Sequence, residues 1–381
     1  MFVLSKEQLE IQRAAKEFAE GEFRNIAREL DEKACFDDKL WKKAAELGFL
    51  AVFLEEKYEG LGLGYFEQCL IIEEFAKVDL GITHAIESTF FGTQLIELVG
   101  TTEQKQKYLP SICLGQIKMG MAITEPNAGS DVSAVCTEAV KDGDEYIING
   151  GKVFITNCKG ADFLVVLCVT DPNNPKVHQR FSTIIVETDR PGYSANPYHG
   201  KLSIRTSETG DANFKNVRVP VSNLLGKEGR GFYNIMNFFN RSRVQVSALA
   251  VGTAQGALDK AIAHVRQREQ FGKPLAAQQL VQGKIAEMIT KTEAARSMCY
   301  RAASLIDAGK PDPALSSMAK WYCAEVAVQV ADEAIQLHGG YGILEEYDVA
   351  HYWRNAKVLE IFEGSKEVEK VIIARKVLGK T

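Results

Sequence analysis

The chain has 381 residues, of which 46% are hydrophobic and 25% are charged, and its formal net charge is −5. These values are typical of a globular protein that is long enough for two or three domains. No basic run or stripe points to nucleic-acid binding. The longest apolar run, residues 163–169, is far shorter than the about 20 residues that a membrane-spanning helix needs.

The N-terminal start, MFVLSKEQLEIQ, lacks the basic region and the apolar core of a secretory signal. This favours a bacterial cytoplasm, although a processed form in the mitochondrial matrix stays open. The eight cysteines include no C-x-x-C pair, which predicts free thiols in a reducing compartment. The histidines show no metal-binding spacing, so no metal is expected.

Helical periodicity dominates the first part of the chain and predicts an N-terminal helical domain over residues 1–116. The first helix begins after Ser5, a residue that caps helices well. The last helix of this domain begins at a threonine cap and carries Glu103 in its first turn. It is predicted to end before Pro110, because proline disfavours helical geometry in the preceding residue. Further helices are expected over residues 37–50, 64–78 and 82–100.

The pattern changes near residue 118, and a middle β domain is predicted over residues 117–225. Residues 133–140 and 145–150 have the composition of two strands, and the turn KDGD between them indicates a hairpin. Further strands are expected over residues 152–156, 163–169, 181–187 and 212–219.

Helical periodicity returns near residue 228 and predicts a C-terminal four-helix bundle over residues 226–381. The expected helices cover residues 228–268, 276–308, 313–337 and 364–378. The predicted fold class is therefore α+β multidomain and mainly α, with a β-sheet domain between two helical domains.

Three segments are candidates for ligand binding, and each also has a purely structural interpretation. Residues 121–134 leave a strand for a turn that exposes N–H groups, which suits a polar ring or an anion but also an ordinary surface loop. Residues 337–342, LHGGYG, hold more glycines than a helix C-cap requires. Arg268, near a helix end, either interacts with the helix dipole or binds a phosphate. Residues 60–64, GLGLG, lack the strand and helix that flank a dinucleotide-binding loop.

The four segments ITEPNAGSDVSA, GGKVFITN, QREQFGKPL and AIQLHGGYGILEEYDVAHYWRNAKVLEIFEGSKEV together resemble the acyl-CoA dehydrogenase family. Their order and separations match, so the resemblance covers essentially the whole chain. It implies FAD-dependent α,β-dehydrogenation of an acyl-CoA to a 2-enoyl-CoA by a homotetramer that passes electrons to electron-transferring flavoprotein. The same residues would also serve an enoyl-CoA reductase, and an alicyclic acyl-CoA is another alternative substrate.

The resemblance implies an FAD site between the β domain and the C-terminal helices. The residues implied in cofactor binding are Met121, Ile123, Thr124, Ser130, Phe154, Thr156, Arg268, Gln270, Phe271, Gln336, Leu337, Gly339, Gly340, Ser365 and Glu367. Phe154 replaces a common tryptophan, which keeps a stacking surface and removes an N–H donor. The segments around Arg268 and Gln336 are implied to reach the cofactor of a neighbouring subunit.

Glu363, in the run IFEGS, is by itself either a solvated carboxylate at a helix start or a base in an apolar pocket. The resemblance implies the base. Removing a proton α to a thioester needs a positioned base and stabilisation of the developing enolate oxygen. The family supplies the latter from a flavin ribityl hydroxyl and the N–H of the base residue, while a hydride leaves the β carbon for flavin N5. Some subgroups carry the base near 240–250, where this chain has no carboxylate.

The resemblance also implies a set of substrate-binding residues. They are Ser130, Glu87, Phe91, Asn240, Arg243, Phe362 and Gly364. Phe362 replaces a common tyrosine, and Thr83 lies about where glutaryl-type members carry an arginine, so a dicarboxylyl substrate is disfavoured. Glu87 is expected deep in the acyl pocket, or alternatively on a solvated helix face. Aromatic bulk at Phe90 and Phe91 would favour a short, branched or ring-bearing acyl group.

Overall fold

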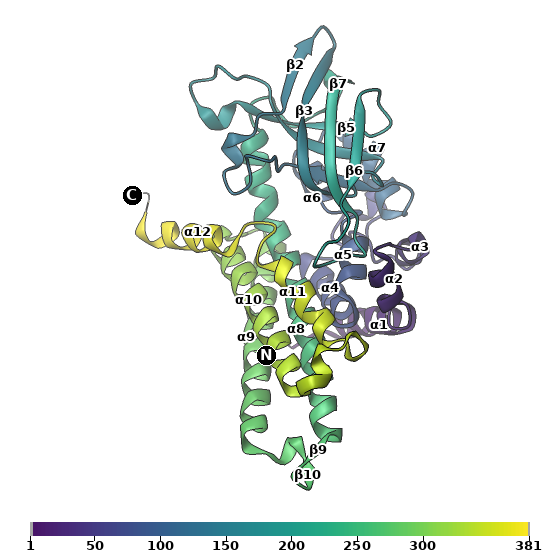
Figure 1. The fold of residues 1–381 in the computed structure, drawn as a ribbon. Helices are drawn as coiled ribbons and strands as arrows, with labels where there is room; N and C mark the ends of the chain where they lie inside the picture. The colour runs from purple at the N-terminus through teal and green to yellow at the C-terminus, as the bar shows by residue number, and fades with distance from the viewer. Residues whose placement is uncertain (1–2, 380–381) are drawn as a thin grey trace.

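The first part of the chain forms helices that pack on one side of the molecule (Figure 1). The structure is a computed structural model, and it describes residues 3–379. The helices are α1 (Lys6–Glu22), α2 (Ala27–Lys33), α3 (Asp38–Glu46), α4 (Tyr65–Val78), α5 (Leu80–Glu87), α6 (Thr93–Val99) and α7 (Thr102–Cys113). Phe18, Phe23, Phe49 and Phe75 fill part of their core, with ring centroids 5.2–5.5 Å apart.

Local capping explains where α1 and α7 begin, and both caps were predicted. The Ser5 hydroxyl accepts a hydrogen bond from the Gln8 N–H at 3.1 Å, and the Gln8 side chain accepts one from the Ser5 N–H at 3.0 Å. Thr101 forms the same reciprocal arrangement at the start of α7. Each cap satisfies N–H groups that have no partner within the helix.

The prediction that α7 ends before Pro110 is wrong, because the helix continues to Cys113. A proline inside a helix removes one N–H donor and crowds the preceding turn. Here Leu109 and Ile112 are fully buried, so the packing of the last turns outweighs this local cost.

The middle of the chain forms a mostly antiparallel sheet. Its strands are β1 (Met119–Ala122), β2 (Glu138–Asp142), β3 (Glu145–Thr156), β4 (Phe163–Val169), β5 (Phe181–Glu187), β6 (Tyr193–Pro197), β7 (Thr209–Pro220) and β8 (Leu224–Leu225). The order is β6-β7-β3-β2-β4-β5-β8, and β1 pairs in parallel with β4. The predicted β2–β3 hairpin is confirmed by the pairing of Asp142 with Glu145.

Two strand predictions differ from the structure in detail. Residues 132–134 form a 3-10 turn, so β2 begins only at Glu138. The segments predicted as separate strands over 145–150 and 152–156 are one strand, β3. Its pairing with β7 shifts register after Ile148 and again after Lys152, and such bulges bend a strand without ending it.

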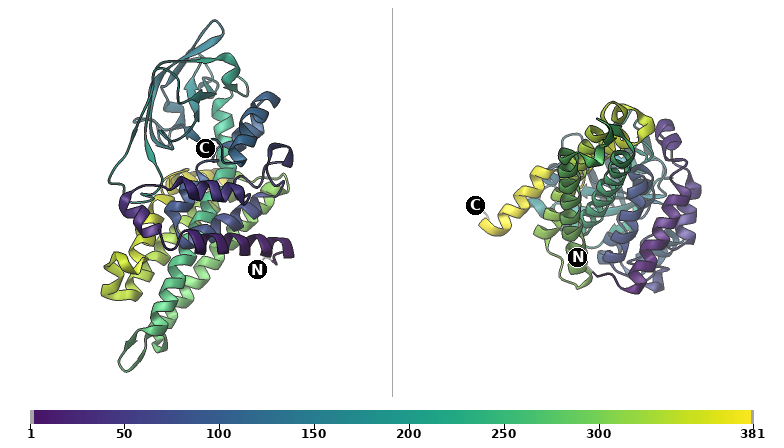
Figure 2. Two further views of the ribbon diagram at one scale, coloured as in Figure 1. Left: turned by 90° about the vertical axis from the view of Figure 1, so that its right-hand side faces the viewer. Right: turned by 90° about the horizontal axis from the view of Figure 1, so that it is seen from below.

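Long helices form the last part of the chain (Figures 1 and 2). They are α8 (Gly231–Gln267), α9 (Gln279–Asp307) and α10 (Pro313–His338), followed by α11 (Val349–Leu359) and α12 (Lys366–Leu378). The short strands β9 (Glu269–Gln270) and β10 (Lys273–Pro274) form a hairpin at the end of the bundle that lies far from the sheet (Figure 1).

The four predicted C-terminal helices are present, but α11 was not predicted as a separate helix. It packs against α8 and α10, whereas the end of α12 projects away from the body of the molecule (Figures 1 and 2). The turn between α11 and α12 therefore lies where α8, α10 and α12 meet. None of the helices formed by residues 3–379 combines the length and the apolar character needed to cross a membrane.

Candidate active site

Glu363 lies in the turn that joins α11 to α12, and this turn has an unusual backbone. Glu363 has φ 56° and Gly364 has φ 102°, so both lie in the region that L side chains rarely adopt. One carboxylate oxygen of Glu363 accepts a hydrogen bond from the Ser242 hydroxyl of α8 at 2.7 Å. The strained conformation is typical of functional sites, where surrounding contacts hold it in place.

The environment of Glu363 strengthens it as a base. Its side chain is half-buried, and burial raises its pKa, although the Ser242 hydrogen bond and the charges of Arg243 and Lys320 act in the opposite direction. A carboxylate with a raised pKa accepts a proton more readily at neutral pH. Within residues 3–379, the Glu363 N–H donates to no protein acceptor, so it is available to a ligand.

Helix α5 brings two further titratable groups toward this turn. Glu87 is buried, and its Oε1 has no hydrogen-bond partner among the described residues. Burial and the charge of Glu363 raise the pKa of Glu87 to about 8. The His84 ring lies 5.6 Å from that of Phe362, and burial with the charge of Lys201 lowers its pKa to about 3. Glu87 is therefore protonated and His84 neutral at pH 7.

A second group of predicted residues lies beside the sheet. The loop that contains Thr124 is held to β3 by Lys152, a fully buried side chain that donates to Ile123 O at 2.9 Å and to Glu125 Oε1 at 2.8 Å. Phe154 follows on the same strand with φ 59°, and 67% of its surface is exposed. An aromatic residue that is both strained and exposed suits a site where a planar ligand covers it.

A third group lines an open cavity of about 450 Å³ at the far end of the bundle. Two segments that are far apart in sequence meet here, and they supply six predicted residues: Arg268, Gln270, Gln336, Leu337, Gly339 and Gly340. A Cβ atom added at Gly339 or Gly340 would meet nothing within 4 Å, so ligand atoms have room beside the backbone. The nearby Phe271, at the tip of the β9–β10 hairpin, is 92% exposed.

The remaining predicted residues lie around these groups. Ser365 caps α12 by accepting from the Val368 N–H at 3.4 Å, and Glu367 is exposed in its first turn. Phe91 meets Phe238 of α8 edge to face, with ring centroids 5.2 Å apart. Their roles toward a ligand stay predictions.

Met121, Ile123 and Thr156 are partly buried next to the Thr124 loop, whereas Ser130 is exposed. Asn240 is partly buried on α8, where its carbonyl accepts from the Ser316 hydroxyl at 2.8 Å. These placements likewise leave their ligand contacts as predictions.

Arg243 is the predicted residue whose setting differs most from the expectation. It was assigned to the CoA portion, but it is only 5% exposed and its Nε lies 3.0 Å from Glu369 Oε1. Sequence reasoning also missed Ser242, Lys320 and Glu369, all of which lie behind the Glu363 turn. An isolated serine, lysine or glutamate on a long helix gives no signal of burial, because burial here depends on how three helices pack.

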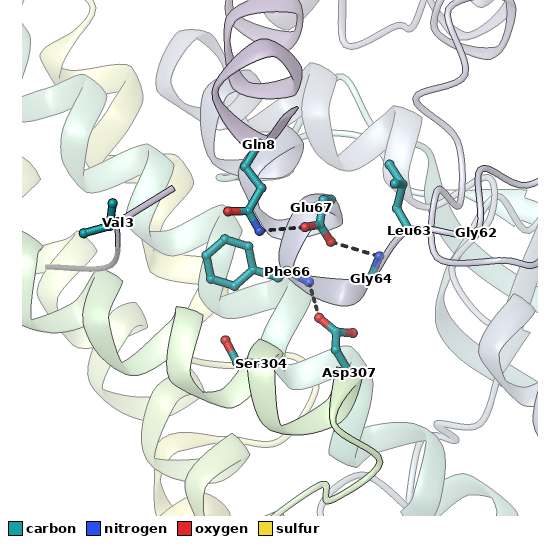
Figure 3. A pocket seen from close by; sticks show the side chains of 9 residues that line it. All are labelled: Val3, Gln8, Gly62, Leu63, Gly64, Phe66, Glu67, Ser304 and Asp307. Atoms are coloured by element: carbon teal, nitrogen blue, oxygen red, sulfur yellow. Dashed lines mark hydrogen bonds between the residues drawn. The ribbon is translucent and has the colours of Figure 1, made fainter. Parts of the chain in front are cut away.

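Another cavity, of about 580 Å³, lies between the start of α4 and the end of α9 (Figure 3). Its polar groups are engaged with one another. The Asp307 carboxylate accepts from the N–H groups of Tyr65 and Phe66, and Gln8 donates to Glu67 at 2.8 Å. These contacts explain the polar lining as a helix cap, and none of the predicted site residues lines this cavity.

Comparisons with known proteins decide the family. Three family models match in succession: the acyl-CoA dehydrogenase N-terminal domain over residues 5–116, the middle domain over 120–217 and the C-terminal domain over 229–378. The acryloyl-CoA reductase (NADH) of Anaerotignum propionicum is 41% identical over 379 residues, which cover 99% of this chain and 96% of that protein. The chain belongs to the acyl-CoA dehydrogenase family.

Solved structures agree with this assignment. Butyryl-CoA dehydrogenase from Megasphaera elsdenii superposes with a TM-score of 0.96 at 36% identity, covering 99% of this chain and 100% of that chain. A chain from the structure of the electron transferring flavoprotein of Acidaminococcus fermentans gives 0.97 at 39% identity, with 100% of both chains covered. As a member of this family, the protein is a flavoprotein oxidoreductase that acts on the CH–CH bond of acyl-CoA thioesters and uses FAD.

The geometry fits the cofactor in two separate places. The exposed Phe154 and the Thr124 loop offer a surface for the flavin ring, and the Arg268 cavity offers a cation, an amide and open glycine backbone for a diphosphate and adenosine. The Arg268 cavity lies by the β9–β10 hairpin, at the end of the bundle that is far from the sheet carrying Phe154 (Figure 1). That one cofactor draws its contacts from two chains of the homotetramer typical of this family stays a prediction.

Proposed function

We propose that Glu363 is the base that removes the α proton of an acyl-CoA thioester. The observation that carries this proposal is the position of Glu363 on a strained turn, where burial raises its pKa and one oxygen is held by Ser242. The unoccupied N–H of Glu363 stabilises the negative charge that develops on the thioester oxygen. The bound FAD supplies the acceptor for the hydride that leaves the β carbon.

A short acyl group is the substrate class that we propose. Phe91, which the resemblance assigns to substrate binding, meets Phe238 edge to face, and Glu87, assigned with it, is a neutral acid at pH 7; both features support this proposal. Two similar proteins carry names with short acyl groups, acryloyl-CoA reductase and butyryl-CoA dehydrogenase. An alicyclic acyl-CoA is the second candidate, because a compact ring has a similar length. A puckered saturated ring needs more width than a butanoyl chain, so the two acyl groups differ in shape rather than polarity.

The physiological direction and the partners form part of the same proposal. Electron-transferring flavoprotein is the proposed electron partner, supported by the solved neighbour of that description and by the family. The 41% identity to a named acryloyl-CoA reductase gives specific support to the reverse reaction as an alternative. A cytoplasmic location is proposed from the bacterial origin of the similar proteins. Domains over residues 1–116, 117–225 and 226–381 are proposed from the change in periodicity along the chain.

The test is an anaerobic titration of the purified holoenzyme with butanoyl-, hexanoyl-, octanoyl-, isobutanoyl-, isovaleryl-, glutaryl- and cyclohexanecarboxyl-CoA. Bleaching of the flavin absorbance by the short thioesters, and its loss in Glu363→Gln, is the expected result. Glu346→Gln is the matched control, since it neutralises an exposed carboxylate in the segment before α11. Full turnover by Glu363→Gln would refute the role of the base. Bleaching by cyclohexanecarboxyl-CoA alone would favour the alicyclic substrate.

The direction needs a separate measurement. The flavin reduction potential of the holoenzyme with each thioester bound is compared with that of the acyl-CoA/enoyl-CoA couple. A flavin potential above the couple supports dehydrogenation, whereas a much lower one, with rapid oxidation by 2-enoyl-CoA, supports the reductase.

A further inference from the structure

Three charged side chains are buried behind the Glu363 turn, each on a different helix. Lys320 of α10 and Glu369 of α12 are 0% exposed, and Arg243 of α8 is 5% exposed. Arg243 Nε lies 3.0 Å from Glu369 Oε1, within ion-pair distance. Buried charges of this kind cost free energy that well-packed apolar side chains would not, so they need an explanation beyond packing.

Both cations of this cluster bind the backbone of the turn. Arg243 Nε donates to the Glu363 carbonyl at 3.3 Å, and Lys320 Nζ donates to the Gly364 carbonyl. These bonds fix the two peptide planes that follow Glu363, and with them the direction of its side chain. A residue in a strained region keeps its conformation only where the surroundings over-determine it, and these two bonds supply that restraint.

Glu369 fills the space on the inner side of the same turn. A Cβ atom built on Gly364 would overlap Glu369 Oε1, so the glycine and this carboxylate fit together. Without Glu369, two positive charges would lie behind the base with no buried counter-charge from α12. The cluster as a whole therefore carries one excess positive charge, where it would otherwise carry two.

We propose that Lys320 and Glu369 are positioning residues for the α-proton abstraction: Lys320 holds the turn that aims Glu363, and Glu369 offsets the cationic charge that would otherwise weaken Glu363 as a base. Neither residue touches the substrate in this arrangement, and both act through Glu363. The inference deepens the proposed function and rests on Glu363 being the base.

Other charged groups around Glu363 do not replace this pair. Glu360, at the end of α11, is engaged by Lys357 and, at 3.3 Å, by Lys366. From α5, Glu87 is neutral at pH 7, with a pKa raised to about 8 by burial and by Glu363, and His84 is neutral as well. The groups that face Glu363 from α8, α10 and α12 are Ser242, Arg243, Lys320 and Glu369.

Opposing effects act on the pKa values of Lys320 and Glu369. Burial lowers the pKa of Lys320 to about 8, while the charges of Glu369 and Glu363 act to raise it. Burial raises the pKa of Glu369, and the charge of Arg243 opposes that rise. Below about pH 7.5 Lys320 is mostly charged, so the acidic limb of a pH profile reports on Glu363 with the cation in place.

The test compares kcat/KM from about pH 5 to about pH 7.5 in the holoenzyme and three variants. In Glu369→Gln the two cations are left unopposed, so the acidic limb should move to lower pH by about one unit. In Lys320→Met a cation is removed, so the limb should move to higher pH by a similar amount, and kcat should fall. The double variant removes one charge of each sign, and its limb should lie between those of the single variants.

Lys370→Met is the matched control, because it removes a cation from the exposed face of α12 next to Glu369. Its acidic limb should coincide with that of the unmodified protein. FAD content and thermal midpoint are measured for every variant, so that loss of folding is separated from a change in the base. If Lys320→Met does not fold, Glu369→Gln and the double variant still decide the sign of the effect.

The results separate this inference from the function on which it rests. Lower rates at every pH with an unmoved limb in both single variants would show a purely structural role and would overturn the inference. Full activity of Glu363→Gln would instead refute the proposed base. Loss of activity in Glu363→Gln, together with unmoved acidic limbs in the variants of Lys320 and Glu369, would support Glu363 as the base. It would refute only the proposed roles of Lys320 and Glu369.

Discussion

Glu87 should make the free energy of unfolding depend on pH, and the substitution Glu87→Gln should remove this dependence. The side chain is 4% exposed, and its Oε1 has no hydrogen-bond partner among the described residues. Burial, assisted by the charge of Glu363, raises the pKa of Glu87 from 4.5 to about 8. Glutamine has nearly the same shape and no charge, so the substitution isolates the titration.

The magnitude follows from linkage between protonation and folding. Between about pH 4.5 and about pH 8 the folded protein holds a proton on Glu87 that the unfolded chain releases, so stability falls as the pH rises through this window. The slope is about 1.4 kcal/mol for each pH unit per proton. Over the 3.5 pH units between 4.5 and about 8, this amounts to roughly 5 kcal/mol.

The assay is the thermal midpoint of the FAD-loaded enzyme at several pH values from about 6 to about 8, at one protein and FAD concentration, because mass action also shifts the midpoint. We expect the midpoint of the unmodified protein to fall with pH more steeply than that of Glu87→Gln. Glu346→Gln, which changes an exposed carboxylate, should keep the original slope. Equal slopes in the unmodified protein and Glu87→Gln would refute the neutral Glu87.

Other substitutions test the turn and the contact that supports α11. Ser242→Ala removes a hydrogen bond that lowers the pKa of Glu363, so the acidic limb of kcat/KM should move to higher pH by about half a unit; an unmoved limb would contradict this. Gly364→Ala forces a side chain into φ 102°, so we expect a loss of at least about 2 kcal/mol in unfolding free energy, and an unchanged thermal midpoint would show that the turn relaxes. Burial opposes a charge on His351, but the charge and hydrogen bond of Asp79 raise its pKa. That stabilisation is present below about pH 6.5 and is lost as the pH rises through the folded pKa, so His351→Gln should destabilise the protein more at about pH 6 than at about pH 9; equal losses would contradict it.

The long helices were predictable because their apolar periodicity extends over many turns. The helix predicted over residues 228–268 became α8, Gly231–Gln267, and the one over 313–337 became α10, Pro313–His338. Helix α11 was missed although Val349 and Tyr352 lie on its buried face. Its apolar pattern is interrupted by Arg354, which is 6% exposed because it pairs with a buried aspartate from the N-terminal helices. A local search for apolar helical periodicity misses a helix whose buried face includes a charged residue, because the distant partner of that residue is not visible in the local sequence.

The candidate site could be predicted only in part, because the burial of some of its residues depends on tertiary packing. Glu363 was predicted as the base because a run of motifs across the whole chain resembled a family, whereas the local sequence left its role open. Glu369 follows it in the run SKEVEK, which has the composition of a solvated helix face. Its complete burial arises only when α12 packs against α8 and α10, and no spacing within α12 indicates that. The residues that we propose to tune Glu363 are therefore recognisable only in the tertiary structure.

A homotetramer would account for two features of the single chain: the separation of its predicted cofactor-binding residues and its exposed apolar side chains. Phe154 lies on the sheet, whereas the Arg268 cavity lies at the end of the bundle far from the sheet, so the two predicted parts of the cofactor site are separated within one chain (Figure 1). The same chain leaves large apolar side chains uncovered where a neighbour would be needed. Phe271 is 92% exposed at the hairpin tip, and Val377 and Leu378 are 79% and 74% exposed on the projecting end of α12. Burying such residues stabilises an assembly by roughly 1.5–3 kcal/mol per large side chain, so we expect tetramer formation and FAD binding to stabilise each other.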